Sequence, residues 1–150
     1  MWRTVGGVIV GYIVMGAFVF VSFTAAYVGM GPERAFQPGS YNVSVLWAVT
    51  SFSLGLVAAL LGGFVCVRIA RRSLGPRILA GLVVLLGLLM AIPVLTADAS
   101  SDPGPRGADV GSVEAMTKAK QPVWFALANP VIGAVGVLVG GRLRRNAAVQ

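Results

Sequence analysis

Four long runs of apolar residues, separated by shorter polar segments, dominate the chain. They cover residues 5–28, 43–67, 78–95 and 123–141, and none of them contains a charged side chain. About 20 apolar residues suffice to cross the hydrocarbon core of a bilayer, and an ionised group at the centre of such a helix costs about 2.5–3.5 kcal/mol. The pattern therefore predicts an all-α fold. Residues 1–150 are expected to form a single transmembrane domain of four helices running up-down-up-down.

The polar segments define the expected connections. Residues 29–42 and 96–122 are predicted to be outer loops, and residues 68–77 a short inner loop. The inner loop contains Ser73-Leu74-Gly75-Pro76, a sequence typical of a tight turn between antiparallel neighbours.

The second outer loop is the only long one, and it contains one candidate helix. A short helix is expected to begin after Asp109 or Ser112, with Glu114 and Lys118 four residues apart and able to form an ion pair. The sequence leaves three roles open for this loop: a lid, an interfacial helix, or a plain connector.

The arginines predict the orientation of the spans. They flank the ends of the runs at three places that share one side only if the number of spans is even. The positive-inside rule makes that side cytoplasmic, together with both termini. The acidic residues all fall in the two outer loops. The topology-determining residues are Arg3, Arg68, Arg71, Arg72, Arg77, Arg142, Arg144 and Arg145.

Composition narrows the class of protein. The chain is 57% hydrophobic and 11% charged, whereas a soluble domain has about 25% charged residues. The net charge of +7 could indicate nucleic-acid binding, but its location at helix ends argues against such a partner. Arginine outnumbers lysine, and Ala, Gly and Val are abundant, which points to a GC-rich bacterial genome. The predicted location is therefore a bacterial inner membrane, with the lipid bilayer as the main partner.

The residues that usually carry membrane catalysis are missing from the sequence. The chain has no histidine, its single cysteine is Cys66, and the runs contain no acidic or basic group. Zinc, haem and iron–sulfur sites would lack their usual ligands, so no metal or other cofactor is expected. Cys66 has no visible base beside it and is interpreted as a small apolar filler. The prediction is a protein without enzymatic activity.

Small residues recur at helical spacing in three of the runs. Such residues allow helix backbones to approach closely in lipid, so the second and fourth spans are predicted to cross at these positions. An alternative is that one of these faces contacts another protein. The candidate packing residues are Gly7 and Gly11 in the first span, Ser51, Gly55, Ala59 and Gly63 in the second, and Gly133, Gly136 and Gly140 in the fourth.

The second and fourth spans also align with each other at a shift of 78 positions. This register matches Gly55 with Gly133, and Ser51 with Asn129. The match indicates either two tandem helical hairpins, related by a pseudo-two-fold axis along the membrane normal, or chance similarity among abundant small residues. Asn129 lies beside Pro130, which frees a backbone carbonyl. Ser51, Asn129 and Pro130 therefore form a candidate intramembrane polar site, either a functional one or an interhelical hydrogen bond.

The chain resembles four-pass inner-membrane proteins of bacteria whose function is unknown. The similarity lies in the four-span architecture and in the ending Pro130-x-x-Gly133-x-x-Gly136-x-x-x-Gly140-Gly141-Arg142, and it implies no activity. The leading hypothesis is a non-catalytic accessory or assembly subunit, or a homo-oligomeric scaffold, that binds itself or another membrane protein. The alternative is a small transporter or channel component with a neutral polar site near Ser51 and Asn129.

Single engineered cysteines at positions 72 and 105, in a variant lacking Cys66, test the predicted orientation. A membrane-impermeant maleimide added to intact cells should label position 105 and leave position 72 unlabelled until the cells are opened. Labelling of position 72 but not of position 105 in intact cells would show that the orientation is opposite to the predicted one.

Overall fold

The computed structural model describes residues 1–96, 104–107 and 111–146. Its long helices are the four expected spans, and each is long and apolar enough to cross a membrane. The prediction of an all-α bundle with four spans is confirmed. The helices are α1 (Trp2–Ala35), α2 (Val45–Ala70), α3 (Leu74–Thr96), a short α4 (Ser112–Thr117) and α5 (Val123–Asn146).

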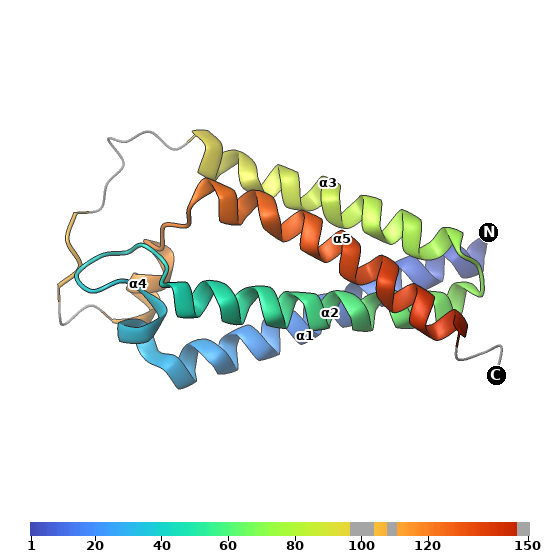
Figure 1. Ribbon diagram of the computed structural model, residues 1–150, viewed down its shortest axis with the longest axis horizontal. Coiled ribbons are helices and arrows are strands. Elements are labelled where there is room, and N and C mark those ends of the chain that lie inside the picture. The colour runs from blue at the N-terminus through green and yellow to red at the C-terminus, as the bar shows by residue number, and fades with distance from the viewer. Residues whose placement is uncertain (97–103, 108–110, 147–150) are drawn as a thin grey trace.

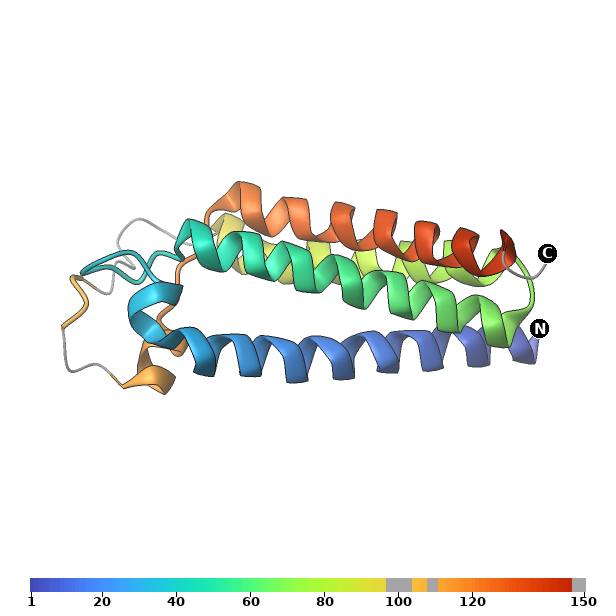
Figure 2. The ribbon, with the colours of Figure 1, turned by 60° about the horizontal axis from the view of Figure 1, so that its bottom comes forward.

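The helices pack in the order α1, α2, α5, α3. α1 packs along α2, α2 along α5, and α5 along α3, whereas α1 and α5 do not meet in the described part of the chain (Figures 1 and 2). α2 and α5 are the central pair, and they bury larger shares of their residues than α1 and α3 do. The start of α1 and the end of α5 lie at one end of the bundle, which we call the arginine end (Figure 1). α4 lies at the opposite end, which we call the cap end (Figure 1).

α1 is longer than the apolar run predicted. The run was expected to end at residue 28, but the helix continues to Ala35 with a break at Gly31, whose φ is +70°. Pro32 begins the final turn, where its missing N–H costs nothing because the first turn of a helix has no internal acceptor. The Gly31-Pro32 pair thus redirects the helix, and the first outer loop is shorter than the predicted 29–42.

The inner loop is also shorter than the predicted 68–77. α2 continues to Ala70 and α3 begins at Leu74, so only residues 71–73 connect them. Arg71 ends α2 in a left-handed conformation, with φ 53° and ψ 17°, and donates its backbone N–H to the Val67 carbonyl. Pro76 is in the first turn of α3, a position that proline favours. The expected turn at Ser73–Pro76 is therefore displaced toward Arg71.

The two outer connections associate with each other. We call residues 32–44, 104–107 and 111–122 the cap. The Val43 N–H donates to the Lys120 carbonyl at 3.0 Å, and the Lys120 N–H donates to the Tyr41 carbonyl at 2.8 Å. Ala35, Phe36 and Ala115 are buried together beneath these bonds. The two segments treated separately in the sequence thus form one folded unit; residues 97–103 and 108–110 of the long loop lie outside the described part.

Arg106 fastens the second connection to the first. Its side chain is 3% exposed, and Nη1 lies 2.9 Å from Oε1 of Glu33, the residue after Pro32 in the last turn of α1. The Arg106 backbone N–H donates to the Gly39 carbonyl, and its guanidinium lies 6.0 Å from the centre of the Phe36 ring. A buried guanidinium needs such partners because desolvation of an unpaired charge is costly.

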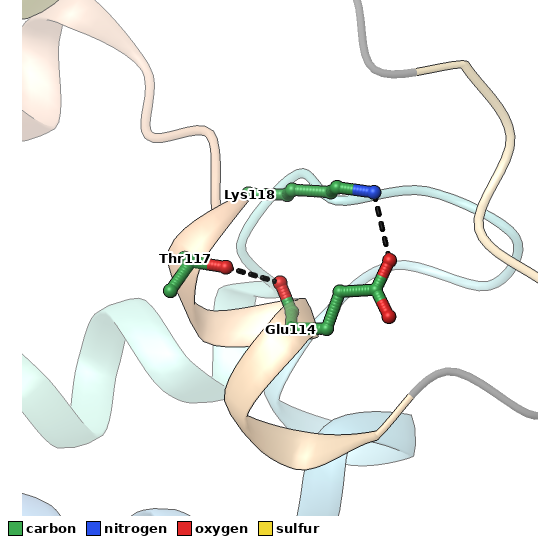
Figure 3. Close-up of polar contacts among 3 residues, drawn as sticks. All are labelled: Glu114, Thr117 and Lys118. Atoms are coloured by element: carbon green, nitrogen blue, oxygen red, sulfur yellow. Dashed lines mark hydrogen bonds and ion pairs between the residues drawn. The ribbon is translucent and has the colours of Figure 1, made fainter.

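α4 carries the expected ion pair on its exposed side. The Lys118 ammonium lies 2.7 Å from the Glu114 carboxylate, and the Thr117 hydroxyl donates to the Glu114 carbonyl (Figure 3). The hydrogen bond to Glu114 raises the pKa of Lys118. Ala115, on the other side, is fully buried against the end of α1. α4 is therefore a packed part of the cap.

Replacing Arg106 by Met should loosen the cap by about 1–2 kcal/mol, because Glu33 is well hydrated and only one side of the pair is buried. In a variant carrying Cys at position 115 and lacking Cys66, maleimide labelling should then accelerate about 5- to 30-fold.

Glu114→Gln is the matched control, since it removes an exposed pair in the same cap and should leave labelling nearly unchanged. Equal acceleration by both variants would contradict the anchoring role of Arg106.

Candidate functional site

The closest helix contact is the crossing of α2 and α5. A Cβ atom at Gly63 would overlap the Val137 carbonyl oxygen, and one at Gly140 would overlap the Leu60 carbonyl oxygen. A Cβ at Gly136 would lie 2.7 Å from the Cβ of Ala59. The two backbones are therefore in direct contact, and a larger side chain at any of these glycines would force the helices apart.

A second close contact joins α1 to α2. A Cβ at Gly7 would lie 2.7 Å from the Cys66 carbonyl oxygen, and one at Gly11 would lie 2.8 Å from the Gly62 carbonyl oxygen. Both glycines of the Gly7-x-x-x-Gly11 sequence thus face α2 and bring the arginine ends of the two helices together.

The surface of α2 that receives α1 was missed in the sequence. It consists of Ala58, Gly62, Cys66 and Ala70, which are four residues apart and buried. They have the same four-residue spacing as Ser51, Gly55, Ala59 and Gly63. The spacing was overlooked because Cys66 was interpreted as an isolated filler. α2 thus has two small-residue faces, one for α1 and one for α5. Cys66 fills space in the first of these, as a small apolar residue would.

Two predicted packing positions behave differently from expectation. A Cβ atom at Gly55 would meet nothing within 4 Å, so this glycine takes no part in the α2–α5 contact. Gly133 faces α3, where a Cβ would lie 2.8 Å from a Val83 methyl group. The helices still meet one turn beyond Gly55, where the centres of the Phe52 and Phe125 rings are 4.6 Å apart, so the direction in which Gly55 faces, and not the length of the contact, keeps it away from α5.

Pro130 belongs to the contact between α5 and α3. Its ring is buried and occupies the space left by Gly87, and the neighbouring contact of Gly133 with Val83 continues the same face of α5. Pro130 therefore has a packing partner of complementary shape in α3.

The structure does not assemble the candidate polar site from Ser51 and Asn129. The Ser51 side chain is buried, and its hydroxyl has no hydrogen-bond partner among the described residues. Asn129 is exposed on the outside of α5. Because Pro130 faces α3, the residue before it is rotated by about 100° on the helix and points away from the bundle.

The contacts between α2 and α5 also correct the register of the proposed duplication by one residue. The contact of Gly63 with Val137 and that of Gly140 with Leu60 exchange under a shift of 77 positions, and Ala59 then pairs with Gly136. The central pair thus has a two-fold pattern of contacts at a shift of 77, whereas 78 was expected. Ser51 corresponds to Ala128 in this register. The pattern does not extend to the outer helices: Gly7 of α1 lies close to α2, whereas a Cβ at Gly81 of α3 would meet nothing within 4 Å.

The predicted topology-determining arginines gather at the arginine end. Arg144 is half-buried, with its guanidinium 5.8 Å from the centre of the Phe64 ring, which ties the end of α5 to α2. Arg145 has its side chain outside the described part. The remaining arginines are exposed: Arg3, Arg68, Arg71, Arg72, Arg77 and Arg142.

The described residues contain no group of three or more His, Cys, Asp or Glu side chains placed to hold a metal ion. The four apolar helices and their lipid-like outer surface of exposed Val, Leu, Ile and Phe define a multi-pass α-helical membrane protein. No family model, no curated protein and no solved structure matches the chain.

Gly63→Ala should destabilise the bundle by about 1–3 kcal/mol, because the added methyl group meets a carbonyl oxygen of α5 and the backbones must separate. An unfolding titration in mixed micelles, followed by circular dichroism, measures this change.

Gly55→Ala is the matched control, with the same substitution in the same helix and open space around it. It should be neutral or slightly stabilising, since alanine favours the helix over glycine by up to about 1 kcal/mol. Equal losses in the two variants would contradict the crossing described above.

Proposed function

We propose that the chain is a non-catalytic subunit of a bacterial inner membrane that acts by packing against other transmembrane helices. It serves either as an accessory or assembly subunit of a larger complex, or as a homo-oligomeric scaffold. Its termini and arginine end face the cytoplasm. The observation that carries the proposal is the exposed amide of Asn129 on the outer surface of α5.

Asn129 lies well inside the apolar part of its helix. It is six residues after Val123, or about 9 Å along the axis. Its side chain forms no hydrogen bond with any described residue of the chain. A polar group that faces hydrocarbon without a partner is costly, and Asn side chains can hydrogen-bond across the interface between two helices. A helix of a second protein molecule would supply that partner.

The exposed Ser and Thr hydroxyls in the spans are satisfied within their own helices. The Thr50 hydroxyl donates to the Leu46 carbonyl, and the Ser53 hydroxyl donates to the Val49 carbonyl, each at 2.8 Å. Hydroxyl groups reach the carbonyl four residues earlier, which is a common arrangement in helices. Asn129 therefore differs from them in needing an external partner.

The proposed orientation rests on charge. The arginine end carries the eight predicted arginines, and residues 1–32, 34–97 and 115–150 contain no Asp or Glu at all. Glu33 and Glu114 lie in the cap. A strongly basic end and a mixed end are the distribution that the positive-inside rule associates with the cytoplasmic and outer sides.

A lack of catalysis is supported by the residue content. The chain has no histidine, and its four spans hold no acidic side chain that could act as an intramembrane acid or base. The transporter alternative relied on a polar site shared by Ser51 and Asn129. These side chains face different surroundings, one buried and one exposed, so no structural observation favours that alternative.

Asn129→Leu should weaken association in lipid about 3- to 10-fold, which corresponds to the loss of one interhelical hydrogen bond. Association can be measured by energy transfer between labelled molecules in phosphatidylcholine bilayers, and by native-gel mass after cross-linking in cell membranes.

Ser53→Ala is the control, because it removes an exposed hydroxyl that is already satisfied in its own helix. Energy transfer between copies identifies a scaffold, and a cross-link to a different chain identifies an accessory subunit. A protein that stays monomeric and cross-links to nothing in both variants would overturn the proposal.

A further inference from the structure

A depression of about 310 Å³ opens at the arginine end, between the start of α1 and the end of α2. Its walls are residues 1–4 and residues 70–72. The close contact of Gly7 with Cys66 and Ala70 fixes these two segments relative to each other. The volume is at the lower end of the range for sites that bind small molecules, about 300–1,000 Å³.

Three exposed arginines line this space, and none is paired with an acidic side chain of the described residues. Arg3, Arg71 and Arg72 line the depression, and none forms an ion pair or side-chain hydrogen bond with the described residues. The sequence contains no acidic residue near this end that could neutralise them. Like charges held in a small space repel one another, so the arrangement is stabilised by a bound anion.

Thr4 adds a neutral donor to the same wall. It is 9% exposed, lines the depression, and its hydroxyl makes no hydrogen bond to a described residue. The hydroxyl oxygen itself keeps some access to solvent, so it can reach a ligand in the depression. A bound oxyanion would accept its hydrogen bond along with those of the guanidinium groups.

Arg71 occupies a position where another residue would be easier to accommodate. Its left-handed backbone, with φ 53°, is the conformation that Gly or Asn usually adopts at the end of a helix. An arginine here costs conformational energy. The cost is understandable if the side chain has a ligand in the depression.

We infer that this depression binds the phosphate group of an anionic phospholipid. Arg3, Arg71 and Arg72 hold the phosphate, because guanidinium groups form paired hydrogen bonds with phosphate oxygens, and Thr4 donates a further bond. The source is a lipid because the site is at the end of two apolar spans, next to Trp2, whose exposed ring suits the membrane interface.

Two triple variants separate a built site from general positive charge. Changing Arg3, Arg71 and Arg72 to Lys keeps the charge, and with it the topology, but removes the guanidinium groups. The matched control changes Arg68, Arg77 and Arg142 to Lys, which are exposed arginines of the same end that do not line the depression. Native mass spectrometry then measures retained lipid in micelles with equal amounts of phosphatidylglycerol and phosphatidylcholine.

The unchanged protein should retain phosphatidylglycerol in preference to phosphatidylcholine. In the depression variant this preference should be about tenfold weaker, which is the effect of losing one charge-assisted hydrogen bond. The control variant should keep the preference of the unchanged protein. Thr4→Val should also lower it, with unchanged thermal unfolding. Equal loss in the two triple variants, or no loss in the depression variant, would overturn the inference. So would inorganic phosphate that displaces the retained lipid at millimolar concentration, since the ligand would then be a free anion.

Discussion

The close approach of α2 and α5 is the contact on which the rest of the bundle depends. Lipid is as apolar as the helix surfaces, so burial of apolar area gives little drive for association, and dispersion forces between close backbones must supply it. Gly63 and Gly140 make this approach feasible on the two sides of Ala59. α1 then packs on α2 and α3 on α5, the two outer helices also contact each other, and the buried Val137 and Leu79 lie in the core that these contacts enclose.

The number and approximate place of the spans could be predicted because the length of an apolar run is a property of the chain itself. The ends of the helices were harder to predict. Pro76 was taken as part of a turn and Pro32 falls in the expected first outer loop, but each lies at the start of a helical segment, so the loops are shorter than expected. The cap could not be predicted, since it depends on Arg106 meeting Glu33 across 73 residues of sequence.

The face on which a residue lies is harder to predict than its depth in the membrane. An alignment of small residues at a shift of 78 or 77 positions looks almost the same in a chain rich in Gly, Ala and Val. The difference is one residue, which turns a side chain by about 100° around the helix. It places Ser51 inside the bundle and Asn129 outside it. The unpartnered hydroxyl of Ser51 is enclosed in the bundle, whereas the unpartnered amide of Asn129 lies on the outer face of α5, where a helix of another molecule can reach it.

The two ends of the bundle treat their charges in opposite ways. In the cap, Arg106 and Lys118 each form an ion pair with a carboxylate of the chain. The arginine end has no acidic side chain at all. Orientation in a membrane explains why basic residues are present there, but lysine would serve that purpose as well. It does not explain why three of them line a depression together with a hydroxyl that has no partner among the described residues. The lipid phosphate inferred above would account for arginines at these positions, because paired guanidinium donors match an oxyanion better than the ammonium group of lysine does.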